Sequence, residues 1–335
     1  MFSAITGHRH PKRLLRRALN NQRLPHAYLF TGPEGIGKAT MARELAAFLF
    51  CGQGITGGPC GQCPACRQFA SANHPDWLHI RPDGAAIKIS QIREIKKQLA
   101  FAPLSAATRV ILIEEAQTMR REAGNSLLKM LEEPPPDNLF LLVASDAQPL
   151  LPTIVSRCQV ISFAPLSQEE TVRVMEARAP ELDRKRAALL ARITNGSPGQ
   201  ALAMKEGRCL EIFAQVTQVL AESADADGAV IEAVLHVAGN MAAAPDELDA
   251  VLDLLHILLG EIAVDLATDG CISLGSAVAR KEHGRLRELW NLAQLSDKIH
   301  AIDRARQALA RHCNRGLVCE ALLLDLLPVP TFPEL

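Results

Sequence analysis

Five short apolar runs, separated by segments with helical periodicity, dominate the first half of the 335-residue sequence. Runs of this length are typical of buried strands and too short for buried helices. The expected strands are His26–Thr31, Trp77–Arg81, Arg109–Ile113, Leu139–Ala144 and Gln159–Phe163. Strands that alternate with helices pair in parallel through right-handed crossovers. The sequence therefore predicts an α/β domain over residues 1–165, built on a five-stranded, mainly parallel sheet.

Three helices are predicted between these strands, over Lys38–Phe50, Ser90–Leu99 and Ala116–Glu132. In the middle helix, apolar residues recur at helical spacing, and Ser90 is the expected N-cap.

The strand pattern ends after Pro165, and the rest of the chain is predicted to be helical. Short helices over Ser167–Arg178 and Arg184–Ile193, a break at Asn195–Gln200 and the start of another helix indicate a small helical domain over 166–207.

A second helical domain is predicted over 208–335. Its clearest feature is one apolar stripe with a spacing of three to four residues, typical of a helix that packs into a core. The stripe consists of Leu248, Val251, Leu252, Leu255, Leu258, Leu259 and Ile262. Two more helices are expected, over Arg285–Arg311 and Leu317–Leu327.

A glycine-rich segment, GPEGIGKAT, lies between the first predicted strand and the first predicted helix. Glycines allow backbone N–H groups to turn toward phosphates, the helix N-terminus adds positive potential, and a lysine adds a cation. This context predicts a phosphate-binding loop, the alternative being a chance glycine-rich turn. Its candidate residues are Gly32, Gly35, Gly37, Lys38, Ala39 and Thr40.

The residues expected to hold a metal ion beside this loop depart from the usual pattern. The position after the lysine normally carries a hydroxyl that binds magnesium, and here it is Ala39. Thr40 could replace it only by a shift in register, because one residue along a helix rotates the side chain by about 100°. The third predicted strand ends at Glu114, in place of the usual aspartate, and Glu115 follows where a water-activating base would stand. Nucleotide binding with ATP or ADP is therefore expected to be retained more readily than magnesium-dependent hydrolysis; a solvated strand end is the alternative for the two glutamates.

Four of the nine cysteines, Cys51, Cys60, Cys63 and Cys66, form a cluster in a glycine-rich insertion over residues 51–66. Thiolates at this spacing suit tetrahedral zinc in a reducing compartment, and four protein ligands make such a site structural. Disulfides and free thiols are the competing interpretations, and the odd number of cysteines argues against a fully paired framework. His74 could in principle replace a cysteine, but an ordinary loop residue is the simpler interpretation.

Composition and charge exclude several classes of protein. Hydrophobic residues make up 48% of the chain, which excludes a largely disordered protein, and no apolar run reaches the roughly 18 residues of a membrane helix. The first residues lack the apolar core of a signal peptide, so we expect a cytoplasmic protein without a membrane role. A net charge of −1 argues against a protein that coats DNA on its own.

Together, GPEGIGKAT, the cysteine insertion, LLKMLEEPP (Leu127–Pro135) and IVSRC (Ile154–Cys158) resemble the delta-prime subunits of bacterial DNA polymerase III clamp loaders. The resemblance covers about the first 205 residues and continues more weakly beyond them. It implies an AAA+ module, made of an α/β domain and a helical lid, followed by a helical collar that joins five subunits in a ring. The implied partners are the motor and delta subunits of the loader and, through the assembled complex, the sliding clamp and primer-template DNA.

The resemblance also implies roles for individual residues. The four cysteines match the zinc ligands of the family, Arg157 matches the arginine finger that reaches the ATP of a neighbouring subunit, and Ser145 matches the polar sensor of the γ-phosphate. A permanently charged guanidinium suits the finger's task because it stabilises a transferring phosphoryl group from outside the pocket. Without the resemblance, Arg157 would be interpreted as a surface charge and Ser145 as a strand-terminal serine.

The motor subunit of the same loader is the main alternative. Its lid carries a sensor arginine at the position that Gly199 occupies here, within Gly196–Leu202. This glycine, Ala39 and Glu114 all favour a delta-prime subunit that does not hydrolyse ATP. A third possibility is a zinc-dependent nucleic-acid-binding module, but few basic or aromatic residues (Arg67 and Phe69) follow the cysteines. The basic stretch His8–Arg17 is a candidate DNA contact, with the solvated face of a helix as the simpler interpretation.

Overall fold

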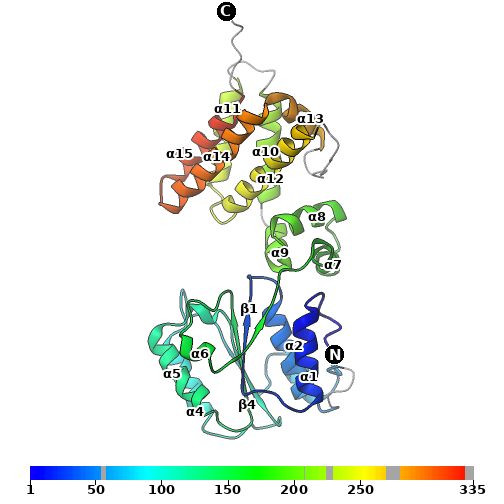
Figure 1. The fold of residues 1–335 in the computed structure, drawn as a ribbon, viewed down its shortest axis with the longest axis vertical. Coiled ribbons are helices and arrows are strands. Elements are labelled where there is room, and N and C mark those ends of the chain that lie inside the picture. The colour runs from blue at the N-terminus through cyan, green and yellow to red at the C-terminus, as the bar shows by residue number, and fades with distance from the viewer. Residues whose placement is uncertain (54–57, 207, 224–228, 269–279, 329–335) are drawn as a thin grey trace, which may run out of the picture. The chain divides into compact units, whose positions relative to one another are not determined.

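The computed structural model describes residues 1–53, 58–206, 208–223, 229–268 and 280–328 (Figure 1). The chain divides into two compact units, the first comprising Met1–Arg173 with Gly196–Gly199 and the second Val174–Asn195 with Gln200–Leu335. The predicted boundaries after residues 165 and 207 remain predictions. The expectations for residues 54–57, 207, 224–228, 269–279 and 329–335 lie outside the described residues.

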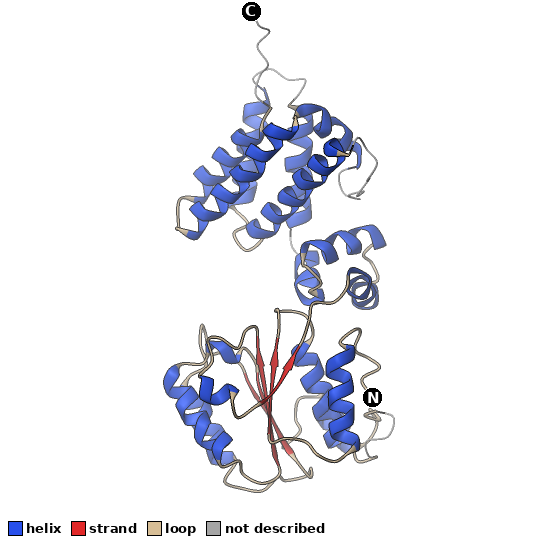
Figure 2. Cartoon of the chain, in the orientation of Figure 1, coloured by secondary structure: helices blue, strands red, loops and turns tan. Residues whose placement is uncertain are grey.

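The first unit is built on a five-stranded parallel sheet with the strand order β2-β3-β4-β1-β5. Figure 2 shows its strands in red between layers of helices. The strands are β1 (Ala27–Thr31), β2 (Trp77–Ile80), β3 (Arg109–Ile113), β4 (Asn138–Ala144) and β5 (Gln159–Ser162). Every residue of β3 and β4 is buried, as expected for the inner strands of a parallel sheet. The predicted strands are therefore confirmed to within a residue or two at their ends.

Helices cover both faces of this sheet, with α1 and α2 on one side and α4, α5 and α6 on the other (Figure 1). The helices of this part are α1 (Arg9–Asn20), α2 (Lys38–Phe50), α3 (Pro64–Ala70), α4 (Ile89–Gln98), α5 (Arg121–Glu132) and α6 (Pro152–Val155). Ile92 and Ile95 of α4 and Leu127 of α5 belong to the same buried core as the sheet residues Ile111 and Phe140.

Two details of the predicted helices are wrong. The N-cap of α4 is Lys88, and Ser90 lies inside the helix; the side-chain oxygen of Gln91 accepts the Lys88 N–H at 2.9 Å and marks the earlier start. The predicted helix Ala116–Glu132 is a 3₁₀ turn, Ala116–Thr118, followed by α5. The chain is extended between them because Thr118 and Arg120 form backbone hydrogen bonds with Ile87, both at 3.3 Å.

All regular elements after Pro165 in the described part of the chain are helices. They are α7 (Gln168–Arg178), α8 (Arg184–Ile193), α9 (Pro198–Glu206), α10 (Cys209–Glu222), α11 (Ala229–Ala242), α12 (Leu248–Ala267), α13 (Arg280–Leu289), α14 (Leu292–Ala310) and α15 (Arg315–Leu326). Every residue of the predicted apolar stripe on α12 is buried. Within the described ranges, no helix has the length and apolar character needed to cross a membrane.

The predicted helix Arg285–Arg311 is also wrong, because it is divided between α13 and α14. The break is at Trp290 and Asn291, where Trp290 is buried and Asn291 caps α14. The Asn291 side chain accepts the Gln294 N–H, and the Gln294 side chain accepts the Asn291 N–H, both at 2.9 Å. This reciprocal capping box satisfies N–H groups that a new helix leaves unpaired and so stabilises a fresh start.

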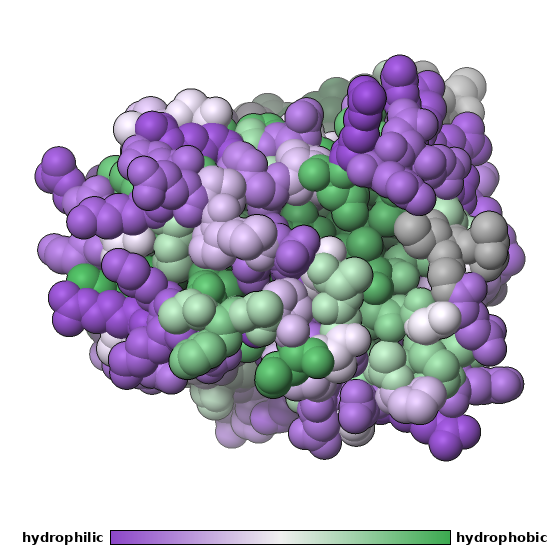
Figure 3. Space-filling model, turned by 90° about the horizontal axis from the view of Figure 1, so that it is seen from below, coloured by the Kyte–Doolittle hydropathy of each residue, from purple (hydrophilic) through white to green (hydrophobic). Residues whose placement is uncertain are grey.

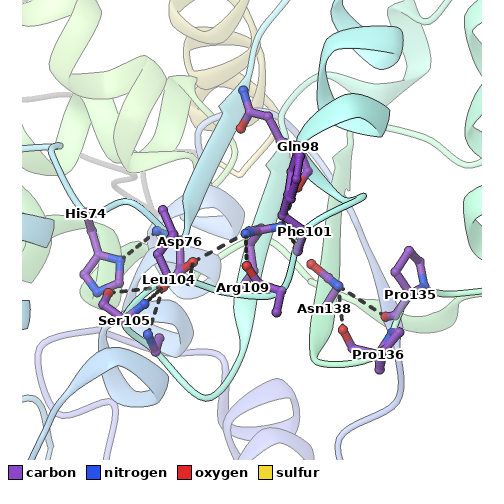
Figure 4. Close-up of polar contacts among 12 residues, drawn as sticks. His74, Asp76, Gln98, Phe101, Leu104, Ser105, Arg109, Pro135, Pro136 and Asn138 are labelled. Carbon is purple, nitrogen blue, oxygen red and sulfur yellow. Dashed lines mark hydrogen bonds and ion pairs between the residues drawn. The ribbon is translucent and has the colours of Figure 1, made fainter.

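A buried ion pair lies at the end of the sheet where the strands begin (Figure 4). Asp76 precedes β2, and Arg109 is the first residue of β3; both are almost fully buried, with Nε and Oδ1 3.7 Å apart. The Asp76 carboxylate accepts the N–H groups of Leu104, Ser105 and Ala106 at 2.7 to 2.8 Å. The Arg109 guanidinium donates to the carbonyls of Gln98, Phe101 and Ala102 at 2.9 to 3.0 Å. The pair thus holds the loop between α4 and β3 from both sides.

This loop presents two large apolar side chains to solvent. Phe101 is 72% exposed and Leu104 is 77% exposed. Figure 3 views the molecule from the end where the strands begin and shows green apolar surface gathered between purple polar side chains. The Asp76–Arg109 pair therefore fixes an exposed apolar loop far along the strands from the glycine-rich loop.

Candidate nucleotide and metal sites

The glycine-rich loop lines a pocket of about 460 Å³ at the carboxyl ends of β1, β3 and β4. All predicted nucleotide-site residues except Gly32 line this pocket, and so do four further residues of the loop, strand and turn regions, Glu34, Gln117, Val143 and Ala144, as well as Gly199. Parallel strands place their carboxyl ends at one edge of a sheet, where ligands of α/β folds bind. The pocket has the position and the residues of a phosphate site.

The carbonyl oxygens of the loop, from Gly32 to Ile36, all accept hydrogen bonds. The donors are Lys38 Nζ to Gly32 O and to Pro33 O, Ser197 Oγ to Glu34 O at 2.7 Å, Gly199 N to Gly35 O at 2.9 Å and His8 Nε2 to Ile36 O at 2.7 Å. In a trans peptide the N–H points opposite to the C=O. Pro33 has no N–H, but the N–H groups of Glu34, Gly35, Ile36 and Gly37 are therefore directed away from the donors, in the arrangement that cradles an anion.

Lys38 is the first residue of α2 and is buried, with 5% of its surface exposed. Burial lowers its pKa to about 8, an effect that the nearby Glu34 carboxylate partly offsets. The ammonium is therefore still mostly charged at neutral pH. Its two bonds to the carbonyls of Gly32 and Pro33 hold the ammonium beside the loop, at the pocket that Lys38 lines.

Two glycines permit close backbone contacts around this loop. Gly32 has φ +141°, and a Cβ there would lie 2.2 Å from the carbonyl oxygen of Phe163. A Cβ at Gly199 would lie 2.7 Å from the Cα of Gly35. The segment Gly196–Gly199 thus packs backbone to backbone on the phosphate loop, and the position aligned with the motor's sensor arginine has no room for a side chain without a shift.

Glu114 is held by three basic side chains on one carboxylate oxygen. Oε1 lies 2.8 Å from His79 Nε2, 3.4 Å from Arg81 NH2 and 3.5 Å from Arg43 NH2. Burial by itself would raise the pKa of Glu114, but the bond from His79 and the two guanidinium groups outweigh it and hold the pKa below its usual value. Glu114 is therefore an ionised partner of this basic cluster.

The basic cluster was not found from the sequence, although a signal exists. His79 and Arg81 flank the end of β2, and β2 pairs with β3 in parallel, with Ile80 opposite Ile113. Arg81 and Glu114, which follow Ile80 and Ile113, are therefore neighbours. Arg43 lies four residues after Ala39 on α2, on the same face of the helix.

The remaining pocket residues lie at strand ends. Ser145 follows β4, and its N–H donates to Gln117 Oε1 at 3.2 Å. Glu115 follows Glu114 with φ 51° in the left-handed region and lines the pocket. Both positions are compatible with the roles that the resemblance implies, which stay predictions.

Arg157 is not among the residues that line this pocket. It follows α6, and its side chain is 35% exposed. NH2 lies 2.7 Å from Glu132 Oε1 at the end of α5, and NH1 donates to Thr153 O at 3.1 Å. Glu132 and the Thr153 carbonyl thus hold the guanidinium in place, while part of it stays accessible to solvent.

The four predicted zinc ligands come together. The sulfurs of Cys51, Cys60, Cys63 and Cys66 all lie within 4.8 Å of one another, and those of Cys60 and Cys66 are 3.9 Å apart. A tetrahedral site with zinc–sulfur bonds of about 2.3 Å has sulfurs about 3.8 Å apart, so the donor set fits zinc. All four are free thiols, which argues against the disulfide interpretation.

Backbone N–H groups donate hydrogen bonds to three of these sulfurs. Cys60 N donates to Cys51 Sγ at 3.4 Å, Cys63 N to Cys60 Sγ at 3.3 Å and Cys66 N to Cys63 Sγ at 3.5 Å. The Cys66 N–H, aided by that of Gly52, lowers the pKa of the Cys63 thiol to about 6. Such donors favour the charged form that binds metal.

His74 does not belong to this cluster. It is buried and stacks on Phe50, with ring centroids 3.9 Å apart, and its Nδ1 accepts the Asp76 N–H at 3.2 Å. Phe69 of α3 packs edge-on against Trp77, with centroids 5.0 Å apart. His74 and these aromatic contacts join the cysteine insertion to the start of β2.

Comparisons with known proteins agree with these motifs. Residues 7–167 match the sequence profile of the family described as "DNA polymerase III, delta subunit". The chain is 40% identical to the DNA polymerase III subunit delta' of Bacillus subtilis over 187 residues, which cover 55% of each chain. It is 36% identical to the subunit delta' of Pseudomonas aeruginosa over 196 residues, covering 58% of this chain and 60% of that one.

A subunit with another name is also similar. The DNA polymerase III subunit tau of Salmonella typhimurium is 33% identical over 307 residues, covering 86% of this chain and 47% of that one. The matches thus span about half the length of these relatives. The matched region carries the phosphate loop, the cysteine cluster and Arg157. Over residues 7–167, about half of its length, this chain is thus similar to the family described as "DNA polymerase III, delta subunit" and to relatives named subunit delta'.

Proposed function

We propose that this chain is a subunit of a DNA polymerase III clamp loader that assists ATP hydrolysis at a neighbouring subunit and does not hydrolyse ATP itself. The names of the relatives, DNA polymerase III subunits delta' and tau, support the assignment to this polymerase. The proposed ring joins it to the motor and delta subunits, and the assembled ring opens the sliding clamp and loads it on primer-template DNA. A cytoplasmic location goes with this role.

The observation that carries the proposal is the position of Arg157. The guanidinium is absent from the lining of the chain's own phosphate pocket, is partly exposed, and is braced by Glu132 and the carbonyl of Thr153. An arginine in this position suits action in trans, because it can reach phosphate from outside another subunit's pocket.

The proposal that this subunit does not hydrolyse ATP also agrees with the residues of its own pocket. Ala39 offers no hydroxyl to a metal ion, and Glu114 is paired with basic side chains. The four cysteines are proposed to hold one structural zinc ion that ties the insertion to α3 and makes no chemical contribution.

The test is ATP hydrolysis by the reconstituted loader with Arg157→Ala in this subunit. Removal of an arginine finger costs about 10³–10⁵-fold in the rate at the site it serves. We expect a loss at that site, with unchanged complex assembly by size-exclusion chromatography. Arg93→Ala, which removes an exposed arginine of α4, is the matched control. Unchanged ATPase activity in an intact Arg157→Ala complex would overturn the proposal.

The second candidate is an active ATPase motor subunit. The similarity to a tau subunit over 86% of this chain and the preserved Gly37–Lys38 pair favour it. Magnesium-dependent turnover by the isolated chain, abolished by Lys38→Ala, would support this role in place of the first.

A further inference from the structure

The magnesium ion that AAA+ folds use with ATP does not fit the residues of this pocket. Magnesium requires near-octahedral oxygen ligands, and phosphate-loop proteins supply a hydroxyl after the lysine and an acidic residue at a strand end. Ala39 has no hydroxyl. Glu114 has a carboxylate, but basic groups already contact it.

The geometry of these basic groups opposes a divalent cation. Arg43, His79 and Arg81 approach the same oxygen of the Glu114 carboxylate, Oε1. Arg43 and Arg81 each bring a guanidinium cation to this oxygen. A metal ion at Oε1 would have to displace these contacts and would lie beside two positive charges that repel it.

The glycine-rich loop that lines the pocket offers backbone amides to phosphate. The loop carbonyls are bound by Lys38, Ser197, Gly199 and His8, which directs the loop N–H groups the other way. Lys38 adds a buried positive charge, and α2 begins at this residue. Backbone amides, a helix N-terminus and a lysine can hold phosphate without a metal ion.

We propose that this pocket binds a nucleoside di- or triphosphate without a divalent cation, with Arg43 taking the place of the metal ion as counter-charge to Glu114. The guanidinium neutralises a carboxylate that would otherwise repel the phosphates. This inference concerns the chain's own pocket and does not depend on the role of Arg157 in a loader.

The test is titration of the purified full chain with a fluorescent ADP analogue, once with excess Mg²⁺ and once with EDTA. We expect the two dissociation constants to agree within about twofold, a difference well below the tenfold step of 1.4 kcal/mol. Lys38→Ala should abolish binding in both buffers, which assigns the signal to this loop.

Variants distinguish the proposed role of Arg43 as a counter-charge from a loss of binding caused by misfolding. Arg43→Ala should weaken binding in EDTA by about tenfold, since it exposes the phosphates to Glu114, whereas Arg93→Ala should bind like the wild type. Arg43→Ala and Arg81→Ala combined with Ala39→Ser remove both guanidinium groups from Glu114 and supply the missing hydroxyl, so binding by this variant should become stronger with Mg²⁺ than with EDTA.

Two results would overturn the inference. One is wild-type binding that falls tenfold or more when EDTA replaces Mg²⁺. The other is no binding of the nucleotide analogue in either buffer. Neither result bears on the loader proposal, whose readout is the ATPase activity of the assembled complex with Arg157→Ala.

Discussion

At the level of single residues, Gly199 makes a close backbone contact with Gly35 that depends on its lack of a side chain. Its N–H bonds to Gly35 O, and its Cα approaches the loop so closely that a Cβ would overlap Gly35. The position that carries the sensor arginine in the motor subunit is therefore used here for backbone packing against the glycine-rich loop. The segment that carries Gly199 supports the glycine-rich loop.

We expect Gly199→Ala to lower the free energy of unfolding by about 1–3 kcal/mol, because the methyl group forces backbone atoms apart. Gly239→Ala is a control with the opposite sign. No atom lies within 4 Å of the added Cβ in α11, and alanine should stabilise the helix by about 0.5–1 kcal/mol. Calorimetry of both variants checks the pair, and equal effects would contradict the close contact.

Cys63→Ser should remove zinc from the protein, because three sulfur ligands hold the ion far less tightly than four. We expect one zinc ion per wild-type chain in metal analysis and none in the variant after dialysis against a weak chelator. Cys313→Ser, which alters an exposed cysteine outside the cluster, should keep its zinc. A metal-free wild-type chain purified in zinc-containing medium would refute the site.

At the scale of elements, the buried Asp76–Arg109 pair connects β2, β3 and the loop after α4. Both charges are buried, and each side chain forms hydrogen bonds with the backbone of the same loop. Such a pair sets the position of exposed Phe101 and Leu104, which have little packing of their own.

Asp76→Ala should destabilise the first unit by about 3–5 kcal/mol, because it leaves the Arg109 charge buried without its partner. Asp83→Ala is the matched control. It breaks an exposed pair with Lys88, which contributes about 0–1 kcal/mol. Urea unfolding followed by Trp77 fluorescence, with Trp290 replaced by Phe in all proteins, measures the free energy of unfolding of both variants. Equal decreases in the two variants would show that the buried pair contributes no more than the exposed one.

The same pair predicts a loss of stability in acid. Burial by itself would raise the pKa of Asp76, but the N–H groups of Ala106, Leu104 and Ser105 outweigh it and hold the pKa below its usual value. A lowered pKa in the folded state contributes stability above the unfolded pKa of about 3.9, and this contribution is lost as the pH falls through the folded value.

We therefore expect the unfolding temperature of the first unit to fall below about pH 4. The fall should be shallower in Asp76→Asn, which starts from a lower stability at neutral pH because the amide is uncharged. Thermal scans across the acid range measure this slope. Parallel curves for the wild type and Asp76→Asn would show that other carboxylates cause the acid unfolding.

At the scale of the whole molecule, the even balance of charge limits what the chain can do alone. Lysine and arginine number 36 against 37 aspartate and glutamate residues. Exposed basic residues do occur on α1, at Arg9, Arg13 and Arg17. A contribution to DNA binding from such a short stretch requires other subunits to complete the basic surface.

The isolated chain should bind primed DNA weakly, and binding should become strong only in the assembled loader. In a plot of log K against log salt concentration for duplex DNA, each neutralised phosphate changes the slope by about −0.9. A chain that contacts few phosphates therefore has a shallow slope. Fluorescence anisotropy at low and high salt measures it. Tight, steeply salt-dependent binding by the isolated chain would favour the nucleic-acid-binding module instead.

The strands, the phosphate loop and the cysteine cluster were predictable because their signals are local. An apolar run between turns indicates a strand, and C-x₂-C spacing indicates a metal site. The break before α5 was not predictable, because it depends on backbone bonds to Ile87, about thirty residues earlier in the chain. The start of α14 was missed although its signal, Asn291 three residues before Gln294, is present in the sequence.

The amino-acid sequence was thus sufficient for the five strands, the glycine-rich loop between β1 and α2, and the identity of the candidate zinc ligands. The partners of Glu114 and the contact of Gly199 required the tertiary structure. Sheet pairing brings β2 beside β3 and packs α2 nearby, so a carboxylate that was expected to face a metal ion meets His79, Arg81 and Arg43 instead. Local spacing determines which groups are available, whereas long-range packing determines which charges meet.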